Sequence, residues 1–323
     1  MRTLLKFYHQ LRNYKVDQPE SQVQLFNYLS NPAKQDFWLR DFIESRQLLA
    51  ETNKRVAVFS VFGSKMMMRL NRADIKIFVA RENLHRSNWK EYNNLCEDIK
   101  SLDLRLGFDY EDSDNYMRFP LWIMWNFPAD VTYEQIKSWC DRVNNPVNMS
   151  YKNRRFCSFL CSHADLGRAE IYEQISQVDR VDCDGRLFHN NDDLKTKYND
   201  DKVAYLRQYR FNLTPENSEA PGYVTEKLFE AISAGCIPIY SGSGNCPEPD
   251  VLNQDAILFI KMFEGMSKDE NKETIEKLRH LNEDEEAYLA YAHQHRLKPE
   301  AADIIWNYIE ELERRLKDII REK

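Results

Sequence analysis

A strand, a loop, a helix and a second strand follow one another directly in residues 210–242, RFNLTPENSEAPGYVTEKLFEAISAGCIPIYSG. Strand-like RFNLTPEN is followed by GYVTEKLFEAISAG, whose apolar residues recur at helical spacing up to Gly235, a typical C-cap glycine. CIPIYSG is an apolar run typical of a buried strand. A strand, helix, strand order joins two parallel strands of one sheet through a right-handed crossover. This part of the chain therefore has the pattern of an α/β fold with a parallel sheet.

The segments before this run repeat the same alternation. FCSFLCSH and RVDCDG are predicted as strands, and GRAEIYEQISQ and KVAYLRQY as helices. A similar series occupies the first half of the chain, where TLLKFY, RVAVFSVFG and IKIFVA are predicted strands and FWLRDFIESRQLLAE is a predicted helix. Repeated alternation of this kind favours doubly wound parallel sheets.

The two series indicate two domains. They are separated by a polar connection that contains Pro146, and 323 residues with 42% hydrophobic content suffice for two cores. We predict two facing Rossmann-like domains, residues 1–150 and residues 151–298, with a C-terminal amphipathic helix in residues 299–323. Because open parallel sheets bind ligands outside the carboxyl ends of their strands, the loop in residues 210–242 is a candidate binding segment.

The composition and the expected C-terminal helix indicate which kinds of partner the protein can have. With 52 acidic against 45 basic side chains the net charge is -7, which gives no electrostatic reason to expect nucleic acid. Neither an apolar run of about 18 residues nor a signal-peptide pattern is found, so we expect a soluble, cytoplasmic protein. We expect the terminal helix to pack back on the protein; the alternative is a peripheral surface for the inner membrane face or for a partner. The oligomeric state is not indicated.

Hydrogen-bonding side chains concentrate at the start of the helix in the opening run. Asn217 and Tyr223 precede it, Thr225 can cap it, and Glu226 and Lys227 lie in its first turn. Unpaired N–H groups and the positive end of the dipole favour anions at a helix start, whereas a lysine there is unfavourable. An anionic ligand removes that penalty. The set favours a nucleotide-sugar site, with a carboxylate for sugar hydroxyls and a lysine for the diphosphate.

Other motifs give weaker indications. GSGN after the last strand lacks the third glycine of a dinucleotide fingerprint, and no phosphate-binding GxxxxGK[ST] is present. Asp182 and Asp184 in DCD have the DxD form with which many sugar transferases hold a divalent ion. The same form recurs by chance in DSD at Asp112, so a metal role for DCD is the minor alternative.

The run YRFNLTPENSEAPGYVTEKLFEAISAGCIPIYSGSG resembles the donor-binding motif of the bacterial and animal α-1,3/4-fucosyltransferases. FCSFLCSHADLGRAEIYEQIS and RVDCDGRLFHNN are similar to segments of the same donor domain, and VARENL and LGFDYEDSDNYMRFPLW look like acceptor-domain signatures. The resemblance implies an inverting, GDP-fucose-dependent glycosyltransferase of the GT-B type, built from two Rossmann-like domains. This chain departs from the pattern at Pro215, where the family usually has Phe, and in a longer SEAPGY loop.

The resemblance also implies roles for residues of the donor domain. Arg168 and Lys227 match the pair that binds phosphate, since Arg can hold two phosphate oxygens and Lys supplies a compact charge. Glu226 is expected to accept hydrogen bonds from ribose or fucose hydroxyls. The remaining candidates lie around these groups: Asn217 and Tyr223 in the donor pocket, and Glu216, Asp182 and Arg186 near it with less support.

Inversion requires a base that takes the proton of the acceptor hydroxyl, and Glu82 in ARENL matches the family's candidate, with Glu111 as the fallback. The scheme requires no metal, although divalent cations could stimulate weakly. The expected partners are a nucleotide sugar and an oligosaccharide, with fucose transferred to GlcNAc or Glc of a β-galactoside, as in Lewis-type lipopolysaccharide glycans. The alternatives are a transferase of the same fold that uses another nucleotide sugar, and a non-catalytic glycan-binding protein.

Overall fold

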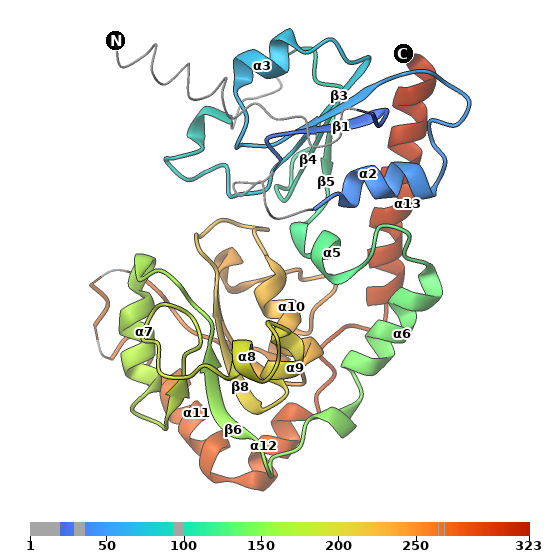
Figure 1. Cartoon of the computed structure of the whole chain (residues 1–323). Helices are drawn as coiled ribbons and strands as arrows, with labels where there is room; N and C mark the ends of the chain where they lie inside the picture. The colour runs from blue at the N-terminus through green and yellow to red at the C-terminus, as the bar shows by residue number, and fades with distance from the viewer. Residues whose placement is uncertain (1–19, 29–35, 93–99, 264, 268) are drawn as a thin grey trace, which may run out of the picture. The chain divides into compact units, whose positions relative to one another are not determined.

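The computed structural model describes residues 20–28, 36–92, 100–263, 265–267 and 269–323 of the chain. These residues form an α/β protein with two parallel five-stranded sheets (Figure 1). The chain divides into two compact units: unit 1 consists of Met1–Thr132 and Trp306–Lys323, and unit 2 of Tyr133–Ile305. The predicted fold class, α/β with two parallel sheets and a C-terminal helix, is confirmed. The functional domain limits at residues 150 and 298 stay predictions.

Unit 1 contains a sheet in which the strands follow their order in the sequence, β1-β2-β3-β4-β5. Neighbouring strands are all parallel, with Phe26 opposite Phe59 and Phe59 opposite Phe78. The strands are β1 (Val23–Phe26), β2 (Val56–Phe59), β3 (Ile75–Val79), β4 (Leu104–Gly107) and β5 (Tyr116–Arg118). The helices are α2 (Trp38–Ser45), α3 (Lys65–Leu70), the short 3-10 turn η1 (Lys90–Tyr92) and α5 (Leu121–Asn126). Every residue of β2 and β3 is buried, as expected for a covered parallel sheet.

The sequence predictions for unit 1 are confirmed for β2, β3 and α2. The strand β1 was missed, because VQLF is flanked by polar residues and offers only four positions of alternation. The predicted strand TLLKFY lies outside the described residues.

The helix α13 (Ala301–Glu322) begins in unit 2 and ends in unit 1. Its apolar side chains Ile309, Leu312 and Leu316 are all at most 1% exposed. Within unit 1, Arg46 Nε lies 3.0 Å from Glu313 Oε2, and Arg315 Nη1 donates to the backbone oxygen of Tyr116 at 2.9 Å. The apolar face of the helix is therefore used for packing within the chain.

None of the helices in the described part of the chain combines the length and apolar character needed to cross a bilayer. The cytoplasmic location and a peripheral contact with a membrane stay predictions from the sequence.

Unit 2 contains the second parallel sheet, in the order β10-β9-β8-β6-β7. Its strands are β6 (Arg155–Phe159), β7 (Val181–Asp182), β8 (Tyr209–Pro215), β9 (Ile237–Ser241) and β10 (Leu258–Phe259). Its helices are α6 (Tyr133–Val143), α7 (Arg168–Ile175), α8 (Asp193–Thr196), α9 (Lys202–Leu206), α10 (Glu226–Ser233), α11 (Lys272–Glu283) and α12 (Glu285–Ala292). Short 3-10 turns complete it: η2 (Pro146–Asn148), η3 (Asp165–Gly167), η4 (Ser243–Asn245) and η5 (Gln254–Ala256). The strands and helices predicted from residue 155 to residue 241 are confirmed in type and order.

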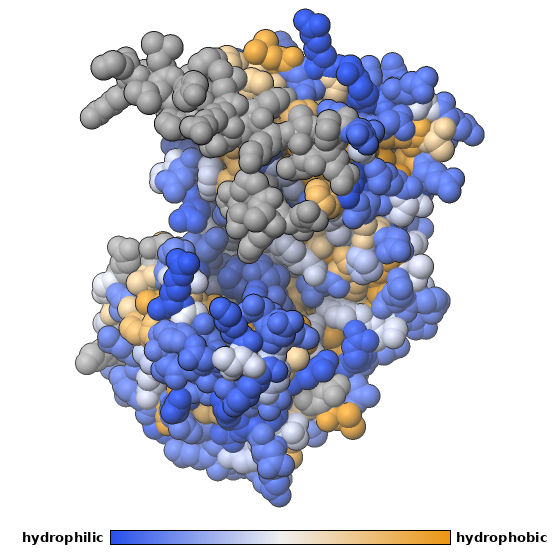
Figure 2. Space-filling model, viewed as in Figure 1, coloured by the Kyte–Doolittle hydropathy of each residue, from blue (hydrophilic) through white to orange (hydrophobic). Residues whose placement is uncertain are grey.

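The order of the strands changes direction at β6. From β6 the chain adds β7 on one side and then returns to add β8 on the other. In a doubly wound sheet such a reversal opens a crevice at the carboxyl ends of the two strands, because their following loops run to opposite faces. The carboxyl ends of β6 and β8 are thus the place in unit 2 where a ligand site is expected. The side of unit 2 that carries α8 and α9 is covered mostly by hydrophilic residues (Figure 2).

Candidate nucleotide-sugar site

A cavity of about 240 Å³ lies at the carboxyl ends of β6 and β8. Residues 159–163, which begin with the last residue of β6, form one part of its wall, and residues 212–215 of β8 form another. Charged and amide side chains from α7, α9, α10 and the loop after β8 complete it: Arg168, Lys202, Asn217, Glu226, Lys227 and Glu230. The topology of the sheet and the position of the cavity therefore agree.

The helix α10 is capped by a buried carboxylate of the chain itself. Glu216 is fully buried, and its Oε1 accepts from the backbone N–H of Thr225 at 2.8 Å while its Oε2 accepts from Thr225 Oγ1 at 2.6 Å. Gly242 makes room for it, since a Cβ there would lie 2.7 Å from Glu216 Cγ. The sequence indicated an external anion at this helix start; Glu216 already supplies a negative charge there.

Lys227 lies between the carboxylates of Glu216 and Glu226. Its Nζ donates to Thr225 Oγ1 at 2.7 Å and lies 3.4 Å from Glu216 Oε2 and 3.8 Å from Glu226 Oε1. Burial by itself lowers the pKa of Lys227, but Glu216 and Glu226 outweigh it and raise that pKa above its ordinary value. The lysine is therefore a fixed cation at neutral pH, and its side chain is 27% exposed toward the cavity that it lines.

Arg168 approaches the same wall from the first residue of α7. It is 5% exposed, its Nη2 donates to the backbone oxygen of Glu216 at 3.1 Å, and its Nη1 donates to that of His163 at 3.4 Å. Its Nε is buried and, among the described residues, has no hydrogen-bond partner. Glu216 thus contacts both cations, Lys227 through its carboxylate and Arg168 through its backbone oxygen.

Glu226 and Asn217 bring acceptors to the cavity. Burial alone raises the pKa of Glu226, but Lys227 and then Lys202 outweigh it and hold that pKa below its ordinary value, so the group is ionised. Asn217 Oδ1 accepts from the hydroxyl of Tyr223 at 3.0 Å. Tyr223 is 2% exposed and is not among the residues of the cavity wall, whereas Asn217, to which its hydroxyl donates, is.

Lys202 and Glu230 were not among the residues selected from the sequence. Lys202 Nζ lies 3.1 Å from Glu230 Oε1 and 3.9 Å from Glu226 Oε1. The spacing of Glu226 and Glu230, four residues apart on one helix, places them on one face and could have indicated Glu230. Lys202 comes from another helix, α9, and has no comparable signal.

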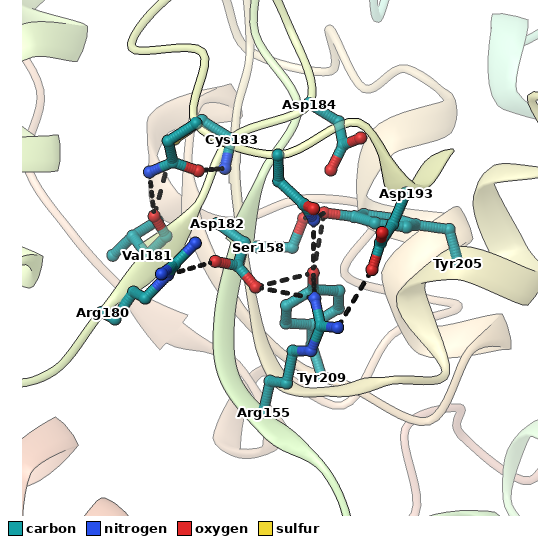
Figure 3. Close-up of polar contacts among 12 residues, drawn as sticks. Arg155, Ser158, Arg180, Val181, Asp182, Cys183, Asp184, Asp193, Tyr205 and Tyr209 are labelled. Atoms are coloured by element: carbon teal, nitrogen blue, oxygen red, sulfur yellow. Dashed lines mark hydrogen bonds and ion pairs between the residues drawn. The ribbon is translucent and has the colours of Figure 1, made fainter. Parts of the chain in front are cut away.

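The DCD residues have separate structural contacts (Figure 3). Asp182 lies 3.0 Å from Arg155 Nη1 and 2.7 Å from Arg180 Nε, and it accepts from the hydroxyl of Tyr209 at 3.0 Å. Asp184 Oδ1 instead accepts from the backbone N–H of Leu194 at 2.9 Å. In the described part of the chain, no group of three or more His, Cys, Asp or Glu side chains has the arrangement of a metal site. Arg186 is exposed after β7 and is absent from the described cavity wall.

The two candidate bases belong to unit 1. Glu82 follows the end of β3 by three residues and is partly exposed. Glu111 follows β4, where it forms an ion pair with Arg105 and accepts from Ser113 Oγ at 2.7 Å. The carboxylate of Glu111 therefore has contacts with β4 and with its own loop.

We predict that Glu216→Ala lowers the free energy of unfolding by about 3–5 kcal/mol, the usual loss when one partner of a buried ion pair is removed. The substitution leaves the N–H of Thr225 without its acceptor and Lys227 with one carboxylate fewer. Denaturant unfolding measures the loss. Glu216→Gln, which keeps the shape and an acceptor, should lose less, and an alanine variant within about 1 kcal/mol of the wild type would contradict the capping role.

Two family models match the chain. Residues 149–307 match the C-terminal domain of glycosyltransferase family 10 (fucosyltransferase), and residues 23–125 match the N-terminal domain of α-(1,3)-fucosyltransferase FucT. The chain belongs to the fucosyltransferase family. The candidate cavity lies in the part of the chain matched by the first model.

Curated fucosyltransferases are among its relatives. The chain is 26% identical over 221 residues to α-(1,3)-fucosyltransferase FucT of Helicobacter pylori, covering 61% of this chain and 44% of that one. It is 28% identical over 149 residues to α-(1,3)-fucosyltransferase B of Drosophila melanogaster, covering 43% and 32%. The chain thus spans less than half the length of these two relatives.

Crystal structures of an α1,3-fucosyltransferase have the same fold. One superimposes with a TM-score of 0.55 at 20% identity and covers 86% of this chain and 87% of that chain. The structure with GDP-fucose gives 0.54 at 19% identity and covers 94% and 95%. At this identity the likeness establishes the fold alone.

Proposed function

We propose that this fucosyltransferase-family chain is an inverting α-1,3-fucosyltransferase that moves L-fucose from GDP-fucose to GlcNAc or Glc of a β-galactoside glycan. The observation that carries the proposal is the cavity at the β6–β8 reversal, where two cations, Arg168 and Lys227, lie beside an ionised carboxylate, Glu226. This combination matches a ligand that has a diphosphate next to sugar hydroxyls. The structural relative that contains GDP-fucose supports this donor.

The two cations match the charge that develops in such a transfer. As the bond between C1 of fucose and the diphosphate oxygen breaks, its electron pair leaves with GDP, so negative charge grows on the phosphates. Lys227 keeps its proton, and Arg168 has a buried Nε that no described residue of the chain satisfies. We assign the diphosphate to this pair. Glu226 accepts from hydroxyls of ribose or fucose, and the Asn217 amide accepts from or donates to such hydroxyls.

We assign the role of general base to Glu82. The acceptor hydroxyl attacks C1 from the face opposite the leaving GDP, and its proton passes to the carboxylate, which gives the inverted product. Glu82 follows the carboxyl end of β3, the edge of a parallel sheet at which functional side chains gather. Glu111 is the fallback candidate, because it is Glu82 that matches the family's candidate base; the carboxylate of Glu111 pairs with Arg105 and accepts from Ser113.

The proposal requires no metal ion, because Arg168 and Lys227 stabilise the leaving diphosphate, and divalent cations are expected to stimulate only weakly. The acceptor class, a Lewis-type β-galactoside, is part of the proposal and rests on the family. Asp182 and Arg186 have no role in this scheme. Tyr223 acts by orienting Asn217, to which its hydroxyl donates.

Binding of nucleotide sugars tests the donor. We expect GDP-fucose to raise the melting temperature, since a ligand at about a hundred times its Kd stabilises the native state by about 2.7 kcal/mol. GDP-mannose should stabilise less, and UDP-galactose little. Stronger stabilisation by a UDP-sugar would favour the alternative of another donor, and a glycan that binds without turnover would favour a non-catalytic glycan-binding protein.

A further inference from the structure

The candidate cavity contains a second pair of opposite charges that the proposed transfer does not use. Lys202 Nζ lies 3.1 Å from Glu230 Oε1 and 3.2 Å from Glu230 Oε2, and both residues line the cavity. Glu230 is only 21% exposed, and this burial raises its pKa above the ordinary value although Lys202 opposes the shift. An ion pair of this kind gains little stability by itself, and both of its side chains line the cavity, where they can contact a ligand.

The pair lies beyond the proposed diphosphate site. Glu230 is one helical turn further along α10 than Glu226, or about 6 Å at 1.5 Å per residue. Leu160 and Leu206 line the same cavity, and Leu206 is 1% exposed. The cavity therefore provides cations and a carboxylate near the start of α10 and, about one turn further along that helix, an ion pair beside apolar walls. This arrangement matches the diphosphate, ribose and base of a nucleotide.

Guanine has an edge that complements this ion pair. Its O6 accepts a hydrogen bond, and the neighbouring N1–H and N2–H2 groups donate. We propose that Lys202 and Glu230 bind the guanine base of the donor, with Lys202 Nζ donating to O6 and the two Glu230 oxygens accepting from N1–H and N2–H. This inference rests on the proposed function, in which the donor is a GDP-sugar, and it assigns the selection of the nucleotide base to two residues.

Other bases fit the pair less well. Hypoxanthine lacks the N2 amino group and leaves one Glu230 oxygen without a donor. Uracil and xanthine place a carbonyl oxygen against that carboxylate oxygen, which is repulsive. Adenine presents an amino group to Lys202 and a lone pair to Glu230, so both contacts are reversed. The expected order of binding is therefore GDP first, then IDP, with XDP, UDP and ADP weaker, because a desolvated polar group left unpaired is costly.

Calorimetric binding of GDP, IDP and XDP to the wild type and to Glu230→Gln tests the proposal. The wild type should bind GDP at least about tenfold more tightly than IDP, since hydrogen bonds to charged groups are among the stronger ones. In Glu230→Gln the amide can donate to the carbonyl oxygen of xanthine, so the ratio of GDP to XDP affinity should fall about tenfold or more. A purely structural role for Glu230 would not change this ratio.

Two further variants complete the experiment. Lys202→Met should weaken GDP and IDP by the same factor, because both bases have O6. Glu270→Gln is the matched control. Glu270 pairs with Lys261 at 2.7 Å in the same unit but is not part of the cavity wall. This variant should therefore bind GDP, IDP and XDP with the affinities of the wild type.

The outcomes separate the two proposals. If Glu230→Gln keeps the GDP to XDP ratio of the wild type, or if the wild type binds UDP or ADP as tightly as GDP, the guanine contact is wrong. If the wild type binds no nucleoside diphosphate, the donor proposal is wrong as well. Should Glu230→Gln fail to fold, Lys202→Met decides, because an unchanged GDP affinity in that variant contradicts the contact with O6.

Discussion

Replacing Glu82 with glutamine is expected to lower the rate of fucosyl transfer about a hundredfold to ten-thousandfold, the usual contribution of a general base, while GDP-fucose binds as in the wild type. Glutamine has nearly the same shape but cannot accept the proton of the acceptor hydroxyl. The proposed donor groups belong to the other unit, so the substitution leaves them unchanged. Transfer rates at saturating donor and acceptor, with calorimetric binding of GDP-fucose, separate the two effects.

Glu111→Gln is the matched control, because it makes the same chemical change at the end of another strand of the same sheet. Its carboxylate is already bound by Arg105 and Ser113, so we expect transfer to stay close to the wild-type rate. Full turnover by Glu82→Gln contradicts the assignment of the base. A loss of turnover in Glu111→Gln alone moves the role to Glu111.

Lys227→Met is expected to slow transfer by about a hundredfold to a thousandfold, the range found when one preorganised group that stabilises developing charge is removed. Affinity for GDP should fall as well, whereas affinity for guanosine, which has no phosphate, should not. Since Glu216 and Glu226 raise the pKa of Lys227, its charge persists well above neutral pH, and loss of activity between pH 6 and pH 9 is not expected to come from this group.

The control for Lys227→Met is Lys272→Met, which makes the same change at the exposed first residue of α11 and should leave transfer unchanged. Stability must be measured beside activity, because Lys227→Met leaves the buried carboxylate of Glu216 with less positive charge nearby. A variant that is folded and transfers fucose at the wild-type rate rules out Lys227 as the phosphate cation. A variant that loses affinity for guanosine and GDP equally indicates a general disruption of the cavity.

Much of the fold can be predicted from local sequence patterns, but the contacts among the buried residues of the site cannot. The strand β8, the loop after it and the helix α10 are formed by consecutive residues. The polar residues Asn217, Glu226 and Lys227 follow β8 at the edge of the sheet where ligands bind. The sequence could not show that Glu216 turns inward to cap α10, because nothing in its neighbours distinguishes a buried glutamate from an exposed one. The strand β1 was missed for a related reason, since four residues give too short a pattern.

Contacts between side chains far apart in the chain are a second feature that the sequence does not predict. Lys202 reaches Glu226 and Glu230 only because α9 packs beside α10, and no spacing rule connects residues so far apart in the chain. Asp182 is a second example: its short acidic motif left a metal role open as a minor alternative, whereas Arg155, Arg180 and Tyr209 converge on its carboxylate in the folded chain. In both cases the tertiary partners decide what the side chain does.

The most direct test of the central proposal is transfer by the wild type. GDP release from GDP-fucose is followed with and without N-acetyllactosamine, in the presence of a chelator, and the product is identified by NMR. We predict acceptor-dependent release of GDP and an α-linked fucose on O3 of GlcNAc. Binding of GDP-fucose with neither acceptor-dependent release nor a fucosylated product, with lactose tried as well, would contradict the proposed activity.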